Sequence, residues 1–99
     1  MSDDDLGGFA LPAFKPDDAL LQLKRSLRDL KLAERGSGFE LRGKRVLELQ
    51  VQGAGIHARI ARKLAMTPEW DKLLVLSAPE QRKFVEEIKK RLARWEREE

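Results

Sequence analysis

The chain contains no cysteine and a single histidine, His57. The missing thiols exclude disulfide bonds, thiolate zinc sites, iron–sulfur clusters and cysteine nucleophiles. One imidazole excludes a histidine cluster, and an isolated histidine close to Arg59 is typical of an exposed strand residue. Because no set of acid, base and nucleophile is evident, we expect a non-catalytic protein that binds no metal and no cofactor.

Long hydrophobic runs are also missing. The longest aliphatic stretch is Leu73-Leu74-Val75-Leu76, whereas a membrane-spanning helix needs about 20 apolar residues. The start of the chain, Met1 to Asp5, is acidic, whereas a signal peptide has a basic start followed by an apolar run. We therefore expect a soluble, cytoplasmic protein with no membrane partner.

The charge is distributed unevenly along the 99 residues. Residues 1–20 hold one basic and five acidic side chains, residues 21–65 hold eleven and four, and residues 66–99 hold eight of each. The net charges of the three segments are therefore −4, +7 and 0, which sum to +3. The basic middle of the chain is the part to which an anion would bind.

The first 16 residues show neither a helical nor an alternating pattern. They combine an acidic triplet with Gly7-Gly8 and with two prolines, Pro12 and Pro16, and this composition predicts a flexible acidic leader. The apolar residues between Phe9 and Phe14 are candidates for docking on the domain or on a partner. The remaining segment, residues 17–99, is long enough for one domain.

Two segments have the apolar spacing of helices. From residue 17 to residue 35, leucines recur every three or four residues, with Asp17 or Asp18 placed to cap the start and Gly36 placed to end the helix. From residue 78 to residue 97, one apolar stripe follows a capping box and a proline in the first turn. The stripe comprises Phe84, Val85, Ile88, Leu92 and Trp95.

Alternating apolar and polar residues predict strands in the middle of the chain. A hairpin is expected to turn at Gly43-Lys44 after Phe39 and Leu41, and the clearest alternation runs from Leu47 to Gln52. Residues 53–66 fit two periodicities: their flanking glycines favour a further hairpin strand, whereas their alanines favour a helix. We expect one more strand from Trp70 to Leu76.

These elements predict an α+β fold. A three- or four-stranded antiparallel sheet would carry an N-terminal and a C-terminal helix, both packed on one face. The order along the chain would be helix, three or four strands, helix.

One stretch resembles the opening of class I S-adenosylmethionine-dependent methyltransferases. Val46-Leu47-Glu48-Leu49 is followed by Gly53-Ala54-Gly55, an alanine-rich segment and Ser77-Ala78-Pro79-Glu80-Gln81. The resemblance covers residues 44–90 and implies a parallel sheet in which residues 55–66 are helical. It departs from the family at Gln50-Val51-Gln52, where small residues are usual, and at Leu76 or Ser77, where a carboxylate would hold the cofactor's ribose.

Ten basic side chains in the middle of the chain are candidates for binding an anion. Four of them recur at spacings of four, three and four on the predicted first helix, so that like charges repel unless an anion neutralises them. The ten are Lys24, Arg28, Lys31, Arg35, Arg42, Lys44, Arg45, Arg59, Arg62 and Lys63. The order of helix, antiparallel sheet and helix is also used by double-stranded RNA-binding domains. The alternative interpretation is an ordinary solvated basic face.

The function that the sequence favours is the binding of a protein partner. The Phe9 to Phe14 segment, Trp70 and Trp95 are candidate anchors for a partner, although Trp95 could equally close the core. An edge strand or the leucine-rich first helix would allow a homodimer. No small-molecule substrate is indicated. We therefore predict a small binding module for a protein or a second copy of the chain. Nucleic-acid binding is the second hypothesis, and a methyltransferase-like fold is the third.

Overall fold

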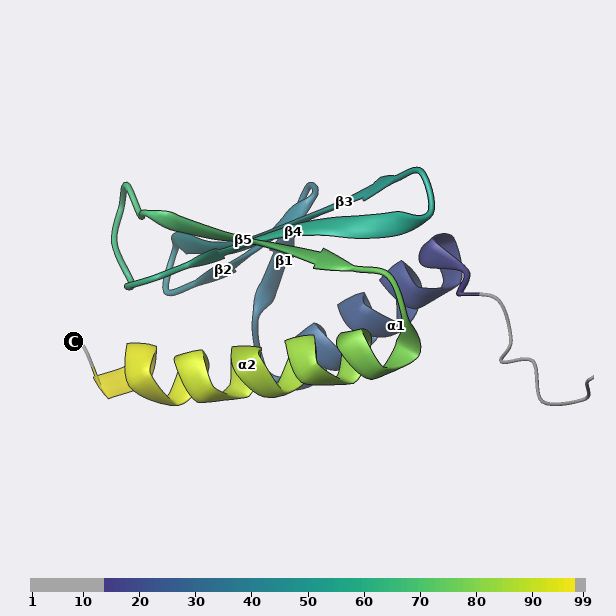
Figure 1. Ribbon diagram of the computed structural model, residues 1–99. Helices are drawn as coiled ribbons and strands as arrows, with labels where there is room; N and C mark the ends of the chain where they lie inside the picture. Colours follow the sequence, from purple (N-terminus) through teal and green to yellow (C-terminus); the bar gives the residue numbers. More distant parts are fainter. Residues whose placement is uncertain (1–13, 98–99) are drawn as a thin grey trace, which may run out of the picture.

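The computed structural model describes residues 14–97, which form an antiparallel sheet with two helices on one of its faces (Figure 1). Residues 1–13 of the predicted leader lie outside the described residues. The elements are α1 (Pro16–Asp29), β1 (Ala33–Arg35), β2 (Gly38–Leu41), β3 (Lys44–Gln52), β4 (Gly55–Ala61), β5 (Trp70–Val75) and α2 (Ala78–Arg97). The predicted α+β class with an N-terminal and a C-terminal helix is confirmed.

The sheet is larger than predicted. Each strand pairs antiparallel with the next, which gives the order β1-β2-β3-β4-β5. Within residues 14–97 it therefore has five strands rather than three or four. The additional strand is β1, which occupies residues that the leucine and charge spacing assigned to the first helix. No helix in the same range is long and apolar enough to cross a membrane.

Helix α1 ends at Asp29 rather than at residue 35. Lys31 has a φ of 71°, its N–H donates to the carbonyl of Arg28 at 2.9 Å, and the N–H of Leu32 donates to the carbonyl of Leu27 at 3.2 Å. This pair of bonds is a Schellman motif, which satisfies the last carbonyls of the helix. Gly36, predicted to end the helix, lies instead in the turn between β1 and β2 with a φ of 58°.

The start of α1 also differs from the prediction. Lys15 is the residue at the N-cap and makes no capping bond with its side chain, and Pro16 is the first helical residue. Asp17 and Asp18 lie within the first turn, where their charges favour the positive end of the helix dipole. They do not cap the helix.

Helix α2 matches its predicted range and cap. The Ser77 hydroxyl accepts a hydrogen bond from the N–H of Glu80 at 3.3 Å. The Glu80 carboxylate accepts a hydrogen bond from the N–H of Leu76 at 2.7 Å. In a capping box this carboxylate usually accepts from the N–H of the N-cap residue, here Ser77, whereas Glu80 accepts from the residue before it. The bond links the start of α2 to the end of β5.

The two long hairpins follow from tight turns. Arg42 and Gly43 have φ values of 55° and 78°, the pattern of a type I′ turn, so the first turn lies one residue earlier than predicted. Gly53, with a φ of 58°, begins the turn between β3 and β4. The hairpin interpretation of residues 53–66 is confirmed for β4. The helical alternative and the parallel sheet implied by the methyltransferase resemblance are wrong, because β3 and β4 pair antiparallel.

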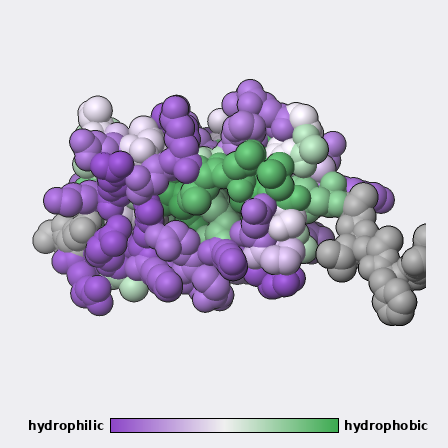
Figure 2. Space-filling model, viewed as in Figure 1, coloured by the Kyte–Doolittle hydropathy of each residue, from purple (hydrophilic) through white to green (hydrophobic). Residues whose placement is uncertain are grey.

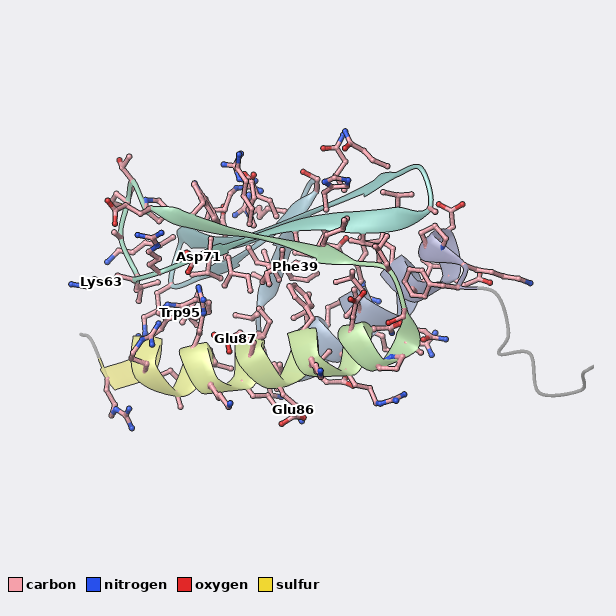
Figure 3. The ribbon with its side chains drawn as sticks, viewed as in Figure 1. Phe39, Lys63, Asp71, Glu86, Glu87 and Trp95 are labelled. Carbon is pink, nitrogen blue, oxygen red and sulfur yellow. The ribbon has the colours of Figure 1, made fainter. Side chains whose placement is uncertain are left out.

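The core lies between the sheet and the two helices. Alternate residues of β3, β4 and β5 face the helices, which contribute Leu23 and Leu27 from α1 and Phe84, Ile88 and Trp95 from α2. Figure 3 shows Phe39 and Trp95 in the space between the sheet and α2. Since Trp95 is fully buried, it closes the core and is not available as an anchor for a partner.

Candidate functional site

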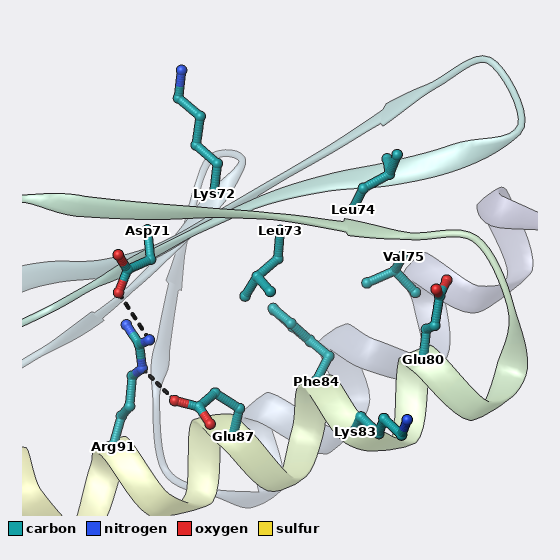
Figure 4. Close-up of a pocket in the computed structure, with 10 residues that line it drawn as sticks. All are labelled: Asp71, Lys72, Leu73, Leu74, Val75, Glu80, Lys83, Phe84, Glu87 and Arg91. Atoms are coloured by element: carbon teal, nitrogen blue, oxygen red, sulfur yellow. Dashed lines mark hydrogen bonds and ion pairs between the residues drawn. The ribbon is translucent and has the colours of Figure 1, made fainter.

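Strand β5 forms one edge of the sheet and carries exposed leucines on both faces. It pairs with β4 on one side, and among residues 14–97 no strand covers its other side. Leu73 is 39% exposed and points toward α2, whereas Leu74 is 46% exposed and points to the opposite face (Figure 4). Leu76, just after the strand, is 48% exposed. Figure 2 shows a green, hydrophobic area at the centre of the view, where β5 runs in Figure 1.

The backbone of this edge is open as well. The N–H of Arg62 donates to the carbonyl of Glu69 at 2.9 Å, in the same register as the β4–β5 ladder. Directly bonded pairs alternate with unbonded pairs along an antiparallel ladder. Asp71, Leu73 and Val75 therefore direct their backbone groups to β4, and the N–H and C=O groups of Lys72 and Leu74 point away from the sheet.

A groove runs between β5 and α2 along this edge. Its volume is about 580 Å³. Leu73 and Val75 of β5 and Phe84 of α2 form its apolar floor, and charged side chains of α2 form its rim (Figure 4). These rim residues are Glu80, Lys83, Glu87 and Arg91. An open strand beside an apolar groove is the arrangement in which an extended segment is bound by strand addition. We call β5, Leu76 and this groove the β5 edge.

A polar network closes one end of the groove. The guanidinium of Arg91, whose side chain is 13% exposed, lies 2.9 Å from Asp71 and 2.7 Å from Glu87. It also donates to the carbonyl of Ala61 at 3.2 Å. Arg62 donates to Asp71 at 2.8 Å. This hydrogen bond, and then that of Arg91, hold the pKa of Asp71 below its usual range, and the same contact raises the pKa of Arg62. The network fixes α2 against β4 and β5.

Several of the ten candidate anion-binding residues are paired with carboxylates. At least six of them have such a partner within residues 14–97: Lys24 and Arg28 contact Glu34, Arg35 contacts Glu40, Arg45 and Arg59 contact Glu48, and Arg62 contacts Asp71 and Glu69. The hydrogen bond from Lys24 lowers the pKa of Glu34. These pairs reduce the positive charge that a phosphate would meet.

The ten residues are also distributed over different parts of the surface. Lys24 and Arg28 are on α1, on the helix side of the sheet. Arg45 and Arg59 are on β3 and β4, and Arg59 points to the opposite face because its neighbours Ala58 and Ile60 are buried against the helices. The remaining six lie elsewhere: Arg35 ends β1, Lys31 and Arg42 lie in turns, Lys44 begins β3, and Arg62 and Lys63 follow β4. The predicted helical stripe of Lys24, Arg28, Lys31 and Arg35 is not formed, because only the first two are helical.

The face of the sheet opposite the helices is mostly polar. His57 is exposed there on β4, as predicted, and lies opposite Leu74 of β5. The guanidinium of Arg59 lies 4.9 Å from the centre of the Trp70 ring, which is a cation–π contact. Trp70 is half-buried beneath it, so this face offers little aromatic surface for stacking a base.

No group of three or more metal-ligating side chains is found among residues 14–97. The acidic triplet Asp3-Asp4-Asp5 lies outside that range. The β5 edge combines an open strand with an apolar groove, and the sequence predicted an edge strand as a route to a homodimer without indicating which strand it would be. A signal was present in the run Leu73-Leu74-Val75-Leu76, because four consecutive aliphatic residues on an edge strand place leucines on both faces.

In comparisons with known proteins, no family model matches the chain, and neither the curated proteins nor the solved structures gave a match.

Proposed function

We propose that this chain is a non-catalytic protein-interaction module and that the β5 edge is its binding surface. The observation that carries the proposal is the combination of an open backbone edge with an apolar groove beside it. Main-chain hydrogen bonds to Lys72 and Leu74 would supply affinity, and the groove would accept alternate side chains of the bound segment.

The distribution of charge supports a protein ligand over a nucleic acid. At least six of the ten candidate basic residues already contact carboxylates within residues 14–97, and the set occupies both faces of the sheet. The rim of the groove carries charges of both signs from Glu80, Lys83, Glu87 and Arg91. A mixed rim around an apolar centre is typical of protein interfaces.

The test is a selection of displayed random peptides on the purified chain, followed by affinity measurements on the enriched peptides. We expect extended peptides with alternating apolar residues, whose binding shifts the amide signals of β5 and α2. Lys72→Pro removes an N–H that points to the open edge, while an edge strand tolerates proline at such a position. The variant should weaken binding at least about tenfold.

Lys72→Ala is the matched control because it removes the same side chain and keeps the N–H. It should bind the peptides within about twofold of the unchanged chain. Far-ultraviolet circular dichroism confirms that both variants are folded. Peptides that bind Lys72→Pro as well as Lys72→Ala would refute the assignment of the β5 edge, and so would shifts confined to α1.

A further inference from the structure

We propose that the partner bound at the β5 edge is a second copy of this chain. The inference rests on the proposed function and names its ligand. The two β5 strands would pair antiparallel about a two-fold axis perpendicular to the sheet, and the two α2 helices would lie side by side beneath them. The evidence for this occupant is the charge pattern of the groove rim and the register that the backbone allows.

The rim of the groove is self-complementary. Along α2 its charges alternate as Glu80, Lys83, Glu87 and Arg91. Two antiparallel copies of this stripe, centred midway along it, place Lys83 opposite the partner's Glu87 and Glu80 opposite the partner's Arg91. Each charge then meets one of opposite sign, as an interface with one self-complementary patch requires.

The centre of this stripe coincides with the exposed leucines of β5. Arg91 contacts Asp71 at one end of the groove, and Glu80 contacts the N–H of Leu76 at the other. Eleven helical residues at about 1.5 Å and five strand residues at about 3.3 Å both span about 16.5 Å. The middle of the charged stripe therefore lies level with the exposed side chains of Leu73 and Leu74.

The backbone selects the register. About a two-fold axis perpendicular to the sheet, the helix-facing residues of one β5 lie opposite helix-facing residues of the other. The axis must therefore pass beside one residue that lies opposite its own copy in the partner, and the pairing is centred on that residue. Centring on Leu73 pairs Lys72 with the partner's Leu74, and the N–H and C=O groups of both residues point to the open edge. Centring on Leu74 would instead need the N–H of Leu76, which is already bonded to Glu80.

In this arrangement both exposed leucines of the strand are covered. Leu73 would meet the partner's Leu73 above the two Phe84 rings, on the helix side. Leu74 would pack against the aliphatic part of the partner's Lys72 on the other face, since long lysine stems cover apolar surface well. The sheets of the two copies would become continuous, and neither β5 would retain an unpaired edge.

The experiment uses two charge-reversed full-length chains and measures mass by sedimentation equilibrium over a roughly hundredfold range of concentration. The unchanged chain should dimerise. Lys83→Glu places glutamates opposite glutamates in its homodimer, and Glu87→Lys places lysines opposite lysines. Each variant alone should therefore dimerise at least about tenfold more weakly. An equal mixture should restore dimers, because both contacts then join unlike charges.

Glu87→Lys also changes the contact of residue 87 with Arg91 in the same chain. Two further variants therefore test the interface without changing that contact. Lys72→Pro should abolish the dimer, whereas Lys72→Ala keeps the N–H, loses only the packing of the lysine stem on Leu74, and should still dimerise clearly more strongly than Lys72→Pro. A chain that stays monomeric at every concentration overturns the proposal, as does a dimer that survives Lys72→Pro and both charge reversals. The N-terminal residues of the same chain are the other candidate occupant of the groove. If the chain is monomeric and Phe9→Ser shifts the amide signals of Leu73 and Leu74 relative to the unchanged chain, those residues bind the groove and the proposal is overturned.

The two proposals fail in distinguishable ways. If the chain is monomeric but selected peptides still shift the amides of β5 and lose affinity with Lys72→Pro, the interaction module stands and the self-partner is wrong. If neither peptides nor a second copy bind this edge, both are wrong.

Discussion

Arg91 is the side chain whose loss should damage the fold most among the charged residues of α2. Its guanidinium contacts Asp71 on β5 and Glu87 on its own helix, and it donates to the carbonyls of Ile60 and Ala61 at 3.5 and 3.2 Å. Arg91→Met removes these donors and keeps a similar apolar stem against the sheet. The variant thus isolates the polar contribution.

The expected cost is about 3 kcal/mol. Hydrogen bonds to charged groups contribute about 1.5–3 kcal/mol each, but the Asp71 and Glu87 side chains are 31% and 39% exposed and can regain water. We therefore assign about 2 kcal/mol to the two ion pairs together. The carbonyls of Ile60 and Ala61 lose their hydrogen bonds from Arg91, and we assign about 1 kcal/mol to that loss. For a domain of this size, a loss of 3 kcal/mol lowers Tm by roughly 12–24 °C.

The assay is guanidinium chloride unfolding followed by circular dichroism, at two protein concentrations so that any contribution of self-association is separated. Arg91→Lys keeps the charge but cannot reach both carboxylates and a carbonyl, so it should lose about half as much. Lys90→Met, on the exposed side of the same turn, is the control and should stay within about 0.5 kcal/mol. An Arg91→Met variant as stable as that control would refute the reasoning.

Three further outcomes follow from the geometry of single residues. Because contacts with Arg62 and Arg91 lower the pKa of Asp71, its contribution to stability is present above the unfolded pKa, near 4, and is lost as the pH falls through the folded pKa. Asp71→Asn should accordingly flatten the acid limb of a stability-against-pH curve below about pH 4, and an unchanged limb would contradict this. Arg42 has a positive φ in the β2–β3 turn, so Arg42→Asn should stabilise the domain by about 0.5–1 kcal/mol in the same unfolding assay, and a loss of stability would count against the type I′ assignment. A Cβ at Gly55 would lie 2.5 Å from Leu76 Cδ2 and 3.0 Å from the carbonyl oxygen of Val75, so Gly55→Ala should raise Leu76 exposure and cost about 1–3 kcal/mol. Gly55→Ala unfolding at the same denaturant concentration as the unchanged chain would show that the contact is absent.

The elements with a strong apolar period were predictable from the sequence. Residues 78–97 carry both a capping box and one continuous stripe, and the helix has those bounds. The alternation from Leu47 to Gln52 lies within β3. For residues 53–66 the glycines on either side of Ala54 favoured a hairpin, and β4 begins at Gly55. In each case local geometry and burial favour the same structure.

The end of α1 was not predictable from the leucine spacing, because Leu30 and Leu32 fit a helix as well as a turn. Lys31 adopts a left-handed conformation that non-glycine residues rarely use, and a lysine side chain does not indicate such a conformation. Tertiary contacts select it: Leu32 is buried in the core, and Glu34 of β1 contacts both Lys24 and Arg28 of α1. Because the chain turns back after Asp29, residues 33–35 form β1, the strand that was not predicted.

The candidate site depends on which strand is left without a neighbour, and this property is not local. Asp71 and Arg91 are 20 positions apart, and the groove between β5 and α2 exists only after the chain has folded. The net charges of the sequence segments indicated only that an anion would bind to the basic middle of the chain. The ion pairs that neutralise much of it, such as Arg59 with Glu48 across β3 and β4, become visible only with the strand register.

The two edges of the sheet differ in a way that supports a role for β5. Natural proteins protect sheet edges with short strands and charged side chains. The β1 edge has both protections, because it is three residues long and its Glu34 and Arg35 are held in ion pairs. The β5 edge is six residues long, and leucines are exposed on each of its faces. An edge of that length and composition invites pairing with another strand, and the alternating charges of α2 beside it restrict which strand can approach. The protection of one edge and the exposure of the other are what a module that binds through β5 requires.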